Sequence, residues 1–158
     1  MKQRLKRASY RSIPGVALAA FTLLLPWVPA RAFFHDTPDI EGGRAIYAAK
    51  CASCHGADLE GQPDWQSARE DATYPAPPHD ETGHTWHHGD AMLRDYIRRG
   101  GQAVLDDMGV DFTSGMPGFG DDLTEDDIEA VLAYIRSTWP DRIRAAQAER
   151  SRLEAGSP

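Results

Sequence analysis

The sequence predicts an all-α fold. Apolar residues recur at the three- and four-residue spacing of a helix in segments 91–99 and 124–137, and no segment keeps the alternation of a strand. Segment 41–50 is rich in alanine, which strongly favours helix. Segment 56–81 lacks sustained periodicity and contains four prolines, so we expect a long loop there. With 158 residues, the chain has room for one domain.

The first 32 residues have the pattern of an export signal. Basic residues precede an apolar stretch from Ile13 to Val28, and Ala30-Arg31-Ala32 gives the small-x-small pattern of a cleavage site. The apolar stretch is short for a membrane span, which needs about 20 residues. We therefore favour cleavage after Ala32 and a periplasmic mature protein without a membrane span. An uncleaved segment would instead anchor the protein to the membrane.

Removal of residues 1–32 would make the protein strongly acidic. That segment holds six of the 17 Lys and Arg residues and none of the 24 Asp and Glu residues, so the mature chain would carry a formal net charge of −13. Such a surface repels nucleic acid and anionic lipid. It suits redox protein partners with a basic docking face, because complementary charge speeds encounter. The alternative is that the excess charge only maintains solubility.

The segment 41–50 leads directly into the motif that carries the chemistry. Cys51-Ala52-Ser53-Cys54-His55 is a C-x-x-C-H sequence, the attachment pattern of haem c. The two thiols can add to the two vinyl groups of one porphyrin, and the adjacent histidine can supply an axial imidazole to the iron. A redox dithiol would need a thioredoxin-like strand and helix, which the flanking sequence lacks. A structural zinc site would need a fourth ligand, for which the later histidines are candidates.

A methionine is the expected sixth ligand of the iron. Met116 lies in a loop rich in glycine and proline, which lets the backbone turn tightly and present the thioether. Met108 is the second candidate, and Met92 lies in a helical segment where a methionine is usually part of the core. We predict that Met116 is the ligand.

The later segments alternate helix and loop. Asp90 is the expected N-cap of a helix over 91–99, which ends at Gly100-Gly101, and 102–123 is expected to be loop. Thr124 begins a capping box with Asp127, which starts a helix that runs to about residue 137. After Trp139-Pro140, segment 141–154 has the composition of a further exposed helix.

This order of helices, haem motif and methionine loop resembles that of class I cytochromes c, from about residue 40 to 138. The resemblance implies a cytochrome c fold, in which helices wrap around one covalently bound haem with long loops between them. Together with the export signal, it divides the chain into a signal peptide (1–32), a cytochrome c domain (33–140) and a helical, partly disordered tail (141–158).

The resemblance also assigns roles to single residues. In this family the first and last helices cross near the haem, and Gly43, Tyr47 and Tyr134 match the small and aromatic residues at that contact. A proline carbonyl usually accepts the ring N–H of the haem-ligating histidine, and either Pro77 or Pro78 would fill that role.

A histidine-rich loop sets this sequence apart from a minimal cytochrome. Four of the six histidines lie within ten residues, at His79, His84, His87 and His88. In the first interpretation, Trp86 and a histidine donate hydrogen bonds to the haem propionates. In the second, the imidazoles bind copper or zinc together with Asp80 or Glu81. In the third, the segment is an ordinary solvated loop.

Histidine and methionine ligation would leave no open position on the iron, which favours electron transfer over catalysis. We expect a carrier between a dehydrogenase or quinol-oxidising complex and a terminal acceptor, and not an enzyme. One alternative is a ligand-binding or peroxidase-like haem enzyme in which Met116 is displaced. Another is a metal-handling protein that uses the histidine loop.

Overall fold

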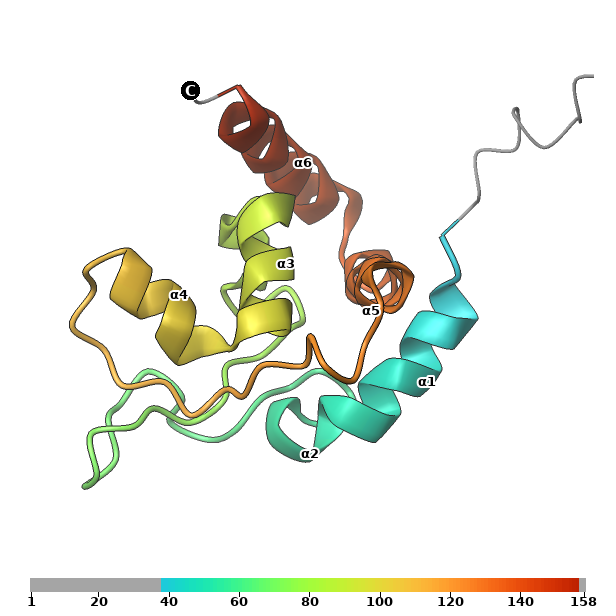
Figure 1. Cartoon of the computed structure of the whole chain (residues 1–158). Coiled ribbons are helices and arrows are strands. Elements are labelled where there is room, and N and C mark those ends of the chain that lie inside the picture. Colours follow the sequence, from blue (N-terminus) through green and yellow to red (C-terminus); the bar gives the residue numbers. More distant parts are fainter. Residues whose placement is uncertain (1–37, 157–158) are drawn as a thin grey trace, which may run out of the picture. The chain divides into compact units, whose positions relative to one another are not determined.

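The computed structural model describes residues 38–156 of the chain. The predicted signal peptide and the last two residues of the predicted tail lie outside these residues. The described chain forms six α-helices and one 3-10 helix (Figure 1): α1 (Ile40–Lys50), α2 (Ala52–His55), η2 (Thr85–His87), α3 (Asp90–Arg99), α4 (Gly101–Asp107), α5 (Glu125–Ser137) and α6 (Asp141–Ala155). Within residues 38–156 there is no strand, so the all-α prediction is confirmed. None of these helices has both the length and the apolar character needed to cross a bilayer.

Helices α1 and α5 cross in close contact (Figure 1). Gly43 is buried at the crossing, where a Cβ atom would overlap the backbone carbonyl of Ala130. The rings of Tyr47 and Tyr134 pack beside this point with centroids 5.5 Å apart. The predicted helix contact is therefore confirmed, and it requires a residue without a side chain at position 43.

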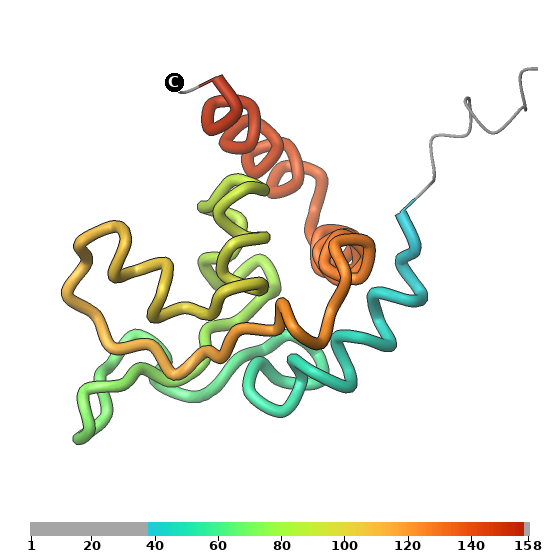
Figure 2. Tube along the Cα trace, viewed as in Figure 1, coloured from blue at the N-terminus to red at the C-terminus, as the bar shows by residue number. Residues whose placement is uncertain are grey.

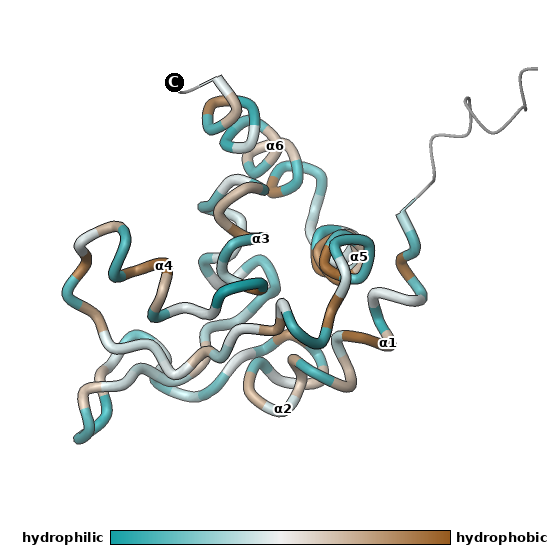
Figure 3. The backbone as a smooth tube through the Cα atoms, viewed as in Figure 1, coloured by the Kyte–Doolittle hydropathy of each residue, from teal (hydrophilic) through white to brown (hydrophobic). Residues whose placement is uncertain are grey.

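The main apolar core lies between these helices and the segment that follows α5. Figure 3 shows that apolar residues are concentrated along α5. The largest side chains that are almost wholly excluded from solvent are Trp139, Tyr47, Ile128, Leu132 and Val131. Three of these five belong to α5, so this helix is the centre around which the other elements pack.

Two long loops complete the described part of the fold. As predicted, residues 56–81 contain neither helix nor strand. This loop and the segment between α4 and α5 run side by side (Figure 2), where Thr73 and Thr113 form an isolated bridge. The rings of Tyr74 and Phe112 stack next to the bridge with centroids 4.4 Å apart.

The prediction of a continuous loop over 102–123 is wrong at its start. Helix α4 begins immediately after α3 and covers Gly101–Asp107. Gly100 has a φ of 85°, a conformation that ends α3 and turns the chain so that a second helix can begin. The glycine pair therefore separates two helices instead of ending one.

The start of α3 also differs from the prediction. Gly89 is the N-cap, and Asp90 is the first helical residue. The carboxylate of Glu154, from α6, accepts hydrogen bonds from the backbone N–H groups of Ala91 and Met92 at 2.8 and 3.0 Å. A distant side chain thus satisfies donors that a local cap usually satisfies.

Helix α6 is less exposed than its composition predicts. It packs against η2 and α3 and buries Ile143 and Gln147. The side-chain amide of Gln147 donates to the Asp90 carboxylate at 2.8 Å. The helical prediction for this segment is confirmed, but one face of the helix belongs to the folded unit.

Candidate haem attachment site

The two cysteines lie at the junction of α1 and α2. Cys51 is both the C-cap of α1 and the N-cap of α2, and Cys54 lies in the single turn of α2. Both thiols are free; Cys51 is half-buried and Cys54 is exposed. Burial, together with the neighbouring Cys54, raises the pKa of Cys51 to about 11. Two free thiols at one helical turn fit the chemistry of addition to two vinyl groups of one porphyrin.

His55 follows the cysteines on the same turn and is buried. Its Nδ1 atom lies 2.8 Å from the carbonyl oxygen of Pro77. Since a carbonyl can only accept, Nδ1 carries the proton and Nε2 keeps the lone pair that an iron would use. Burial also lowers the pKa of His55, which keeps the imidazole neutral. Of the two predicted prolines, Pro77 makes this hydrogen bond.

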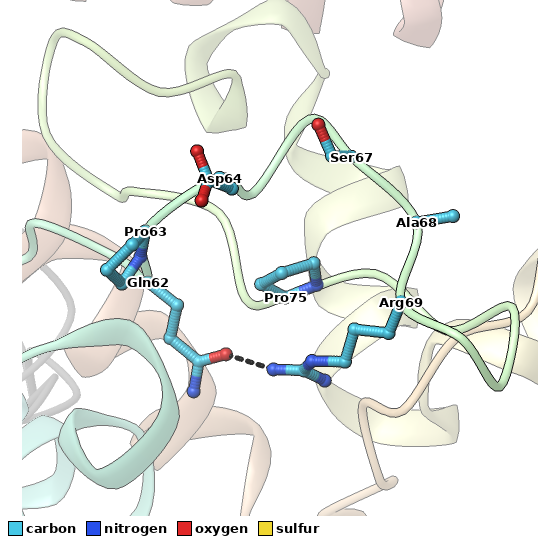
Figure 4. A pocket seen from close by; sticks show the side chains of 7 residues that line it. All are labelled: Gln62, Pro63, Asp64, Ser67, Ala68, Arg69 and Pro75. Atoms are coloured by element: carbon cyan, nitrogen blue, oxygen red, sulfur yellow. Dashed lines mark hydrogen bonds between the residues drawn. The ribbon is translucent and has the colours of Figure 1, made fainter.

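The loop before Pro77 is held by Gln62. The backbone N–H of Gln62 donates to the carbonyl of Ala76 at 2.9 Å, and its side-chain oxygen accepts from the N–H of Ala76 at 3.2 Å. Arg69 donates to the same oxygen at 2.6 Å, beside an open pocket in this loop (Figure 4). These bonds position the carbonyl that orients His55.

Tyr47 connects the core to the haem motif. Its hydroxyl donates to the carbonyl of Gly56 at 3.1 Å and approaches the carbonyl of His55 at 3.4 Å. Burial raises the pKa of Tyr47 far above its ordinary value, so the hydroxyl remains a donor. The tyrosine predicted at the helix contact therefore also fixes the end of α2.

His79 lies against His55, an arrangement that the sequence did not indicate. The two imidazole rings stack with centroids 3.8 Å apart. The Nδ1 atom of His79 is buried without a hydrogen-bond partner, and burial lowers the pKa of this residue well below its ordinary value. The indole N–H of Trp139 donates to the backbone carbonyl of His79 at 2.7 Å. Trp139, which had no assigned role, thus anchors the residue that supports His55.

The loop that carries Met116 is fastened to α3 and α4 through its backbone. The carbonyl of Met116 accepts from Gly101 at 3.0 Å, and its N–H donates to the hydroxyl of Ser114 at 3.2 Å. Further along the loop, Phe119 donates to the carbonyl of Ile97 at 2.8 Å. Met116 itself is half-buried.

The other two methionines within residues 38–156 lie on α3 and just after α4. Met108 follows the last turn of α4 and is 51% exposed. Met92 is half-buried on α3. Both line a surface groove beside α3 that Met116 does not line.

Trp86 already has a hydrogen-bond acceptor in the structure. Its indole N–H donates to the carbonyl of Glu81 at 3.3 Å, and its ring stacks on His87 at a centroid distance of 3.7 Å. A hydrogen bond from Trp86 to a haem propionate stays a prediction. It would require the indole N–H to leave the carbonyl of Glu81.

The comparison with known families agrees with the geometry of the motif. Residues 40–139 match the cytochrome c family, whereas no curated protein and no solved structure matches the chain. Members of this family are typically electron carriers that act through haem c, and the match does not favour a metal-handling or peroxidase-like function. Because the match covers most of the chain and includes the entire haem motif, the chain belongs to the cytochrome c family.

Proposed function

We propose that this chain is a monohaem electron carrier of the periplasm with His55 and Met116 as axial ligands. The observation that carries the proposal is the hydrogen bond of 2.8 Å from His55 Nδ1 to Pro77, which leaves Nε2 free to bind iron. When bound, haem c supplies a one-electron iron couple. The chain contains only two cysteines, so Cys51 and Cys54 would attach a single haem.

Three features support Met116 as the second ligand. It is half-buried, whereas Met108 is 51% exposed. Its loop is tied to α3 and α4 by backbone hydrogen bonds, which hold a thioether in place better than a free loop does. A methionine ligand also favours ferrous iron, which suits a carrier of relatively high potential.

The charge of the chain supports a role in exchange with protein partners. With both axial positions filled, the iron would have no open position for a substrate. Electrons would therefore leave through contact with another redox protein. The net charge of −13 expected for residues 33–158 favours a partner with a basic docking face.

Optical spectroscopy of the purified holoprotein tests the ligands. We expect one haem per chain, and the spectrum of the reduced protein should not change when carbon monoxide is added. The Met116→Ala variant should bind carbon monoxide, whereas Met108→Ala, the matched control, should behave like the wild type. Carbon monoxide binding by the wild type, or by the Met108→Ala variant alone, would contradict the proposal.

Small redox reagents of opposite charge test the role of the acidic surface. Oxidation by a cationic cobalt complex should slow as salt is added, because salt screens the attraction between opposite charges. Oxidation by ferricyanide, an anion, should become faster under the same conditions. If the rate does not change with salt for either reagent, the acidic charge does not act at the point of electron exit.

A further inference from the structure

The structure separates the four clustered histidines into two groups. His79 lies against His55, whereas the other three belong to η2 or to its two caps. His84 is the N-cap of this short helix and His88 is its C-cap. This single turn brings the two Nε2 atoms of His84 and His88 to 2.9 Å from each other.

A distance of 2.9 Å between two imidazole nitrogens suits one metal geometry in particular. Two metal–nitrogen bonds of about 2.0–2.1 Å at a right angle place the nitrogens about 2.9 Å apart, which is the adjacent-ligand arrangement of tetragonal Cu(II). The tetrahedral angle of zinc would place them about 3.3 Å apart. Cu(II) also binds nitrogen ligands most tightly among the divalent first-row metals.

The surrounding elements hold the two rings in this arrangement. The backbone N–H of His88 donates to the carbonyl of Thr85 at 3.2 Å, which closes the turn. The side-chain amide of Gln147, on α6, donates to the carbonyl of His88 at 3.3 Å. The ring of Trp65 makes an edge contact with His84 at a centroid distance of 6.2 Å. The pair is therefore supported by the loop on one side and by α6 on the other.

We propose that His84 and His88 form a two-imidazole site for Cu(II), in which solvent supplies the remaining ligands. Within residues 38–156, no group of three or more His, Cys, Asp or Glu side chains is arranged to hold a metal, so the protein would supply only these two. The site is independent of the proposed electron transfer and would exist in addition to it.

Without a metal, the same two nitrogens can share one proton in an N–H···N hydrogen bond, since 2.9 Å is an ordinary hydrogen-bond distance. The experiment must therefore distinguish a copper ligand pair from a simple hydrogen bond. It must also exclude the amino terminus of the mature chain. Cleavage after Ala32 would make His35 the third residue, where the terminal amine, two amides and the imidazole together bind Cu(II). His35 lies outside the described residues.

Copper titration of the holoprotein that carries His35→Gln provides the test. Calorimetry in the presence of glycine as a competitor measures affinity and stoichiometry, and electron paramagnetic resonance counts the nitrogens bound to copper after subtraction of the copper-free spectrum. We expect one Cu(II) per chain with two imidazole nitrogens. His84→Gln and His88→Gln should each lower the affinity at least about tenfold and leave one nitrogen.

The matched control is His87→Gln, because His87 is an exposed histidine of the same turn that does not belong to the pair. It should bind copper like the reference protein. The proposal is wrong if the reference protein binds no stoichiometric copper, or if its copper has no pair of imidazole nitrogens. It is also wrong if His87→Gln weakens binding as much as His84→Gln does. The nitrogen count in the reference protein tests the proposal even if a variant unfolds, and normal haem spectra separate this result from the proposed electron transfer.

Discussion

His55 and Met116, the two proposed axial ligands, are held in contrasting ways. His55 is buried among side chains, with its ring hydrogen-bonded to Pro77 and stacked on His79. Met116 is half-buried in a loop that depends on backbone hydrogen bonds to the end of α3 and the start of α4. Changes on the His55 side should therefore alter the stability of the whole fold. Changes on the Met116 side should alter iron ligation while the fold persists.

Gly43→Ala should have the largest effect on the free energy of unfolding. It tests whether the His55 side depends on the core. The added Cβ would overlap the carbonyl of Ala130, so α1 and α5 would have to move apart. We expect the free energy of unfolding to fall by about 3 kcal/mol. Chemical denaturation of the holoprotein measures the loss. The control is Gly115→Ala, since a Cβ at that position meets nothing within 4 Å. Equal stability of the two variants would contradict the role assigned to the crossing.

Gly118→Ala is the corresponding change on the Met116 side. A Cβ at this position would lie 2.8 Å from the backbone carbon of Arg99, so the loop must shift away from α3. We expect the reduced protein to bind carbon monoxide because Met116 is displaced, while the free energy of unfolding falls by only about 1 kcal/mol. Parallel optical and denaturation measurements check both parts. Loss of the global fold would show that the two sides are not separable.

Tyr47→Phe should have a smaller effect on the His55 side. It removes the hydroxyl that donates to the carbonyl of Gly56 at 3.1 Å, and the ring that packs on Tyr134 remains. We expect a loss of about 1 kcal/mol, the usual contribution of a hydrogen bond. Thermal unfolding measures it, with Tyr134→Phe as the comparison. An equal loss in the two variants would mean that the hydrogen bond from Tyr47 to Gly56 does not fix the haem motif.

Ser114→Ala should have the smallest effect on stability. The hydroxyl of Ser114 accepts from the N–H of Met116 at 3.2 Å in a partly exposed loop. Its removal should lower the free energy of unfolding by about 0.5 kcal/mol and make the sixth ligand easier to displace. Imidazole titration of the oxidised protein measures that displacement. If imidazole binds no more readily than to the wild type, the serine does not help to hold Met116.

Sequence patterns predicted the features that depend on neighbouring residues. The capping box at Thr124 is local and adopts the expected form. The motif from Cys51 to His55 is also local, and it forms a single helical turn after α1. Helix α4 was missed because Gly100-Gly101 resembles a helix end, although the chain starts a new helix after the turn. A seven-residue helix also carries too few apolar positions for its period to be recognised.

Long-range contacts could not be predicted in the same way. Trp139 and His79 are 60 residues apart, yet one hydrogen bond between them supports the ring that packs on His55. The sequence predicted Asp90 as the N-cap of α3, whereas the carboxylate that caps this helix belongs to Glu154, more than 60 residues further along the chain. No local pattern contains that information, since it depends on how α6 packs on α3.

The contact between Glu154 and α3 has a consequence for the order in which the protein matures. A ribosome makes the chain from its amino end, so Cys51, Cys54 and His55 exist long before the carboxylate that caps α3. Helix α3 in turn provides backbone acceptors for the loop that holds Met116. The thiols can thus meet their cofactor before the Met116 loop is in place, and the last turns of the chain then stabilise the helix to which that loop is bonded.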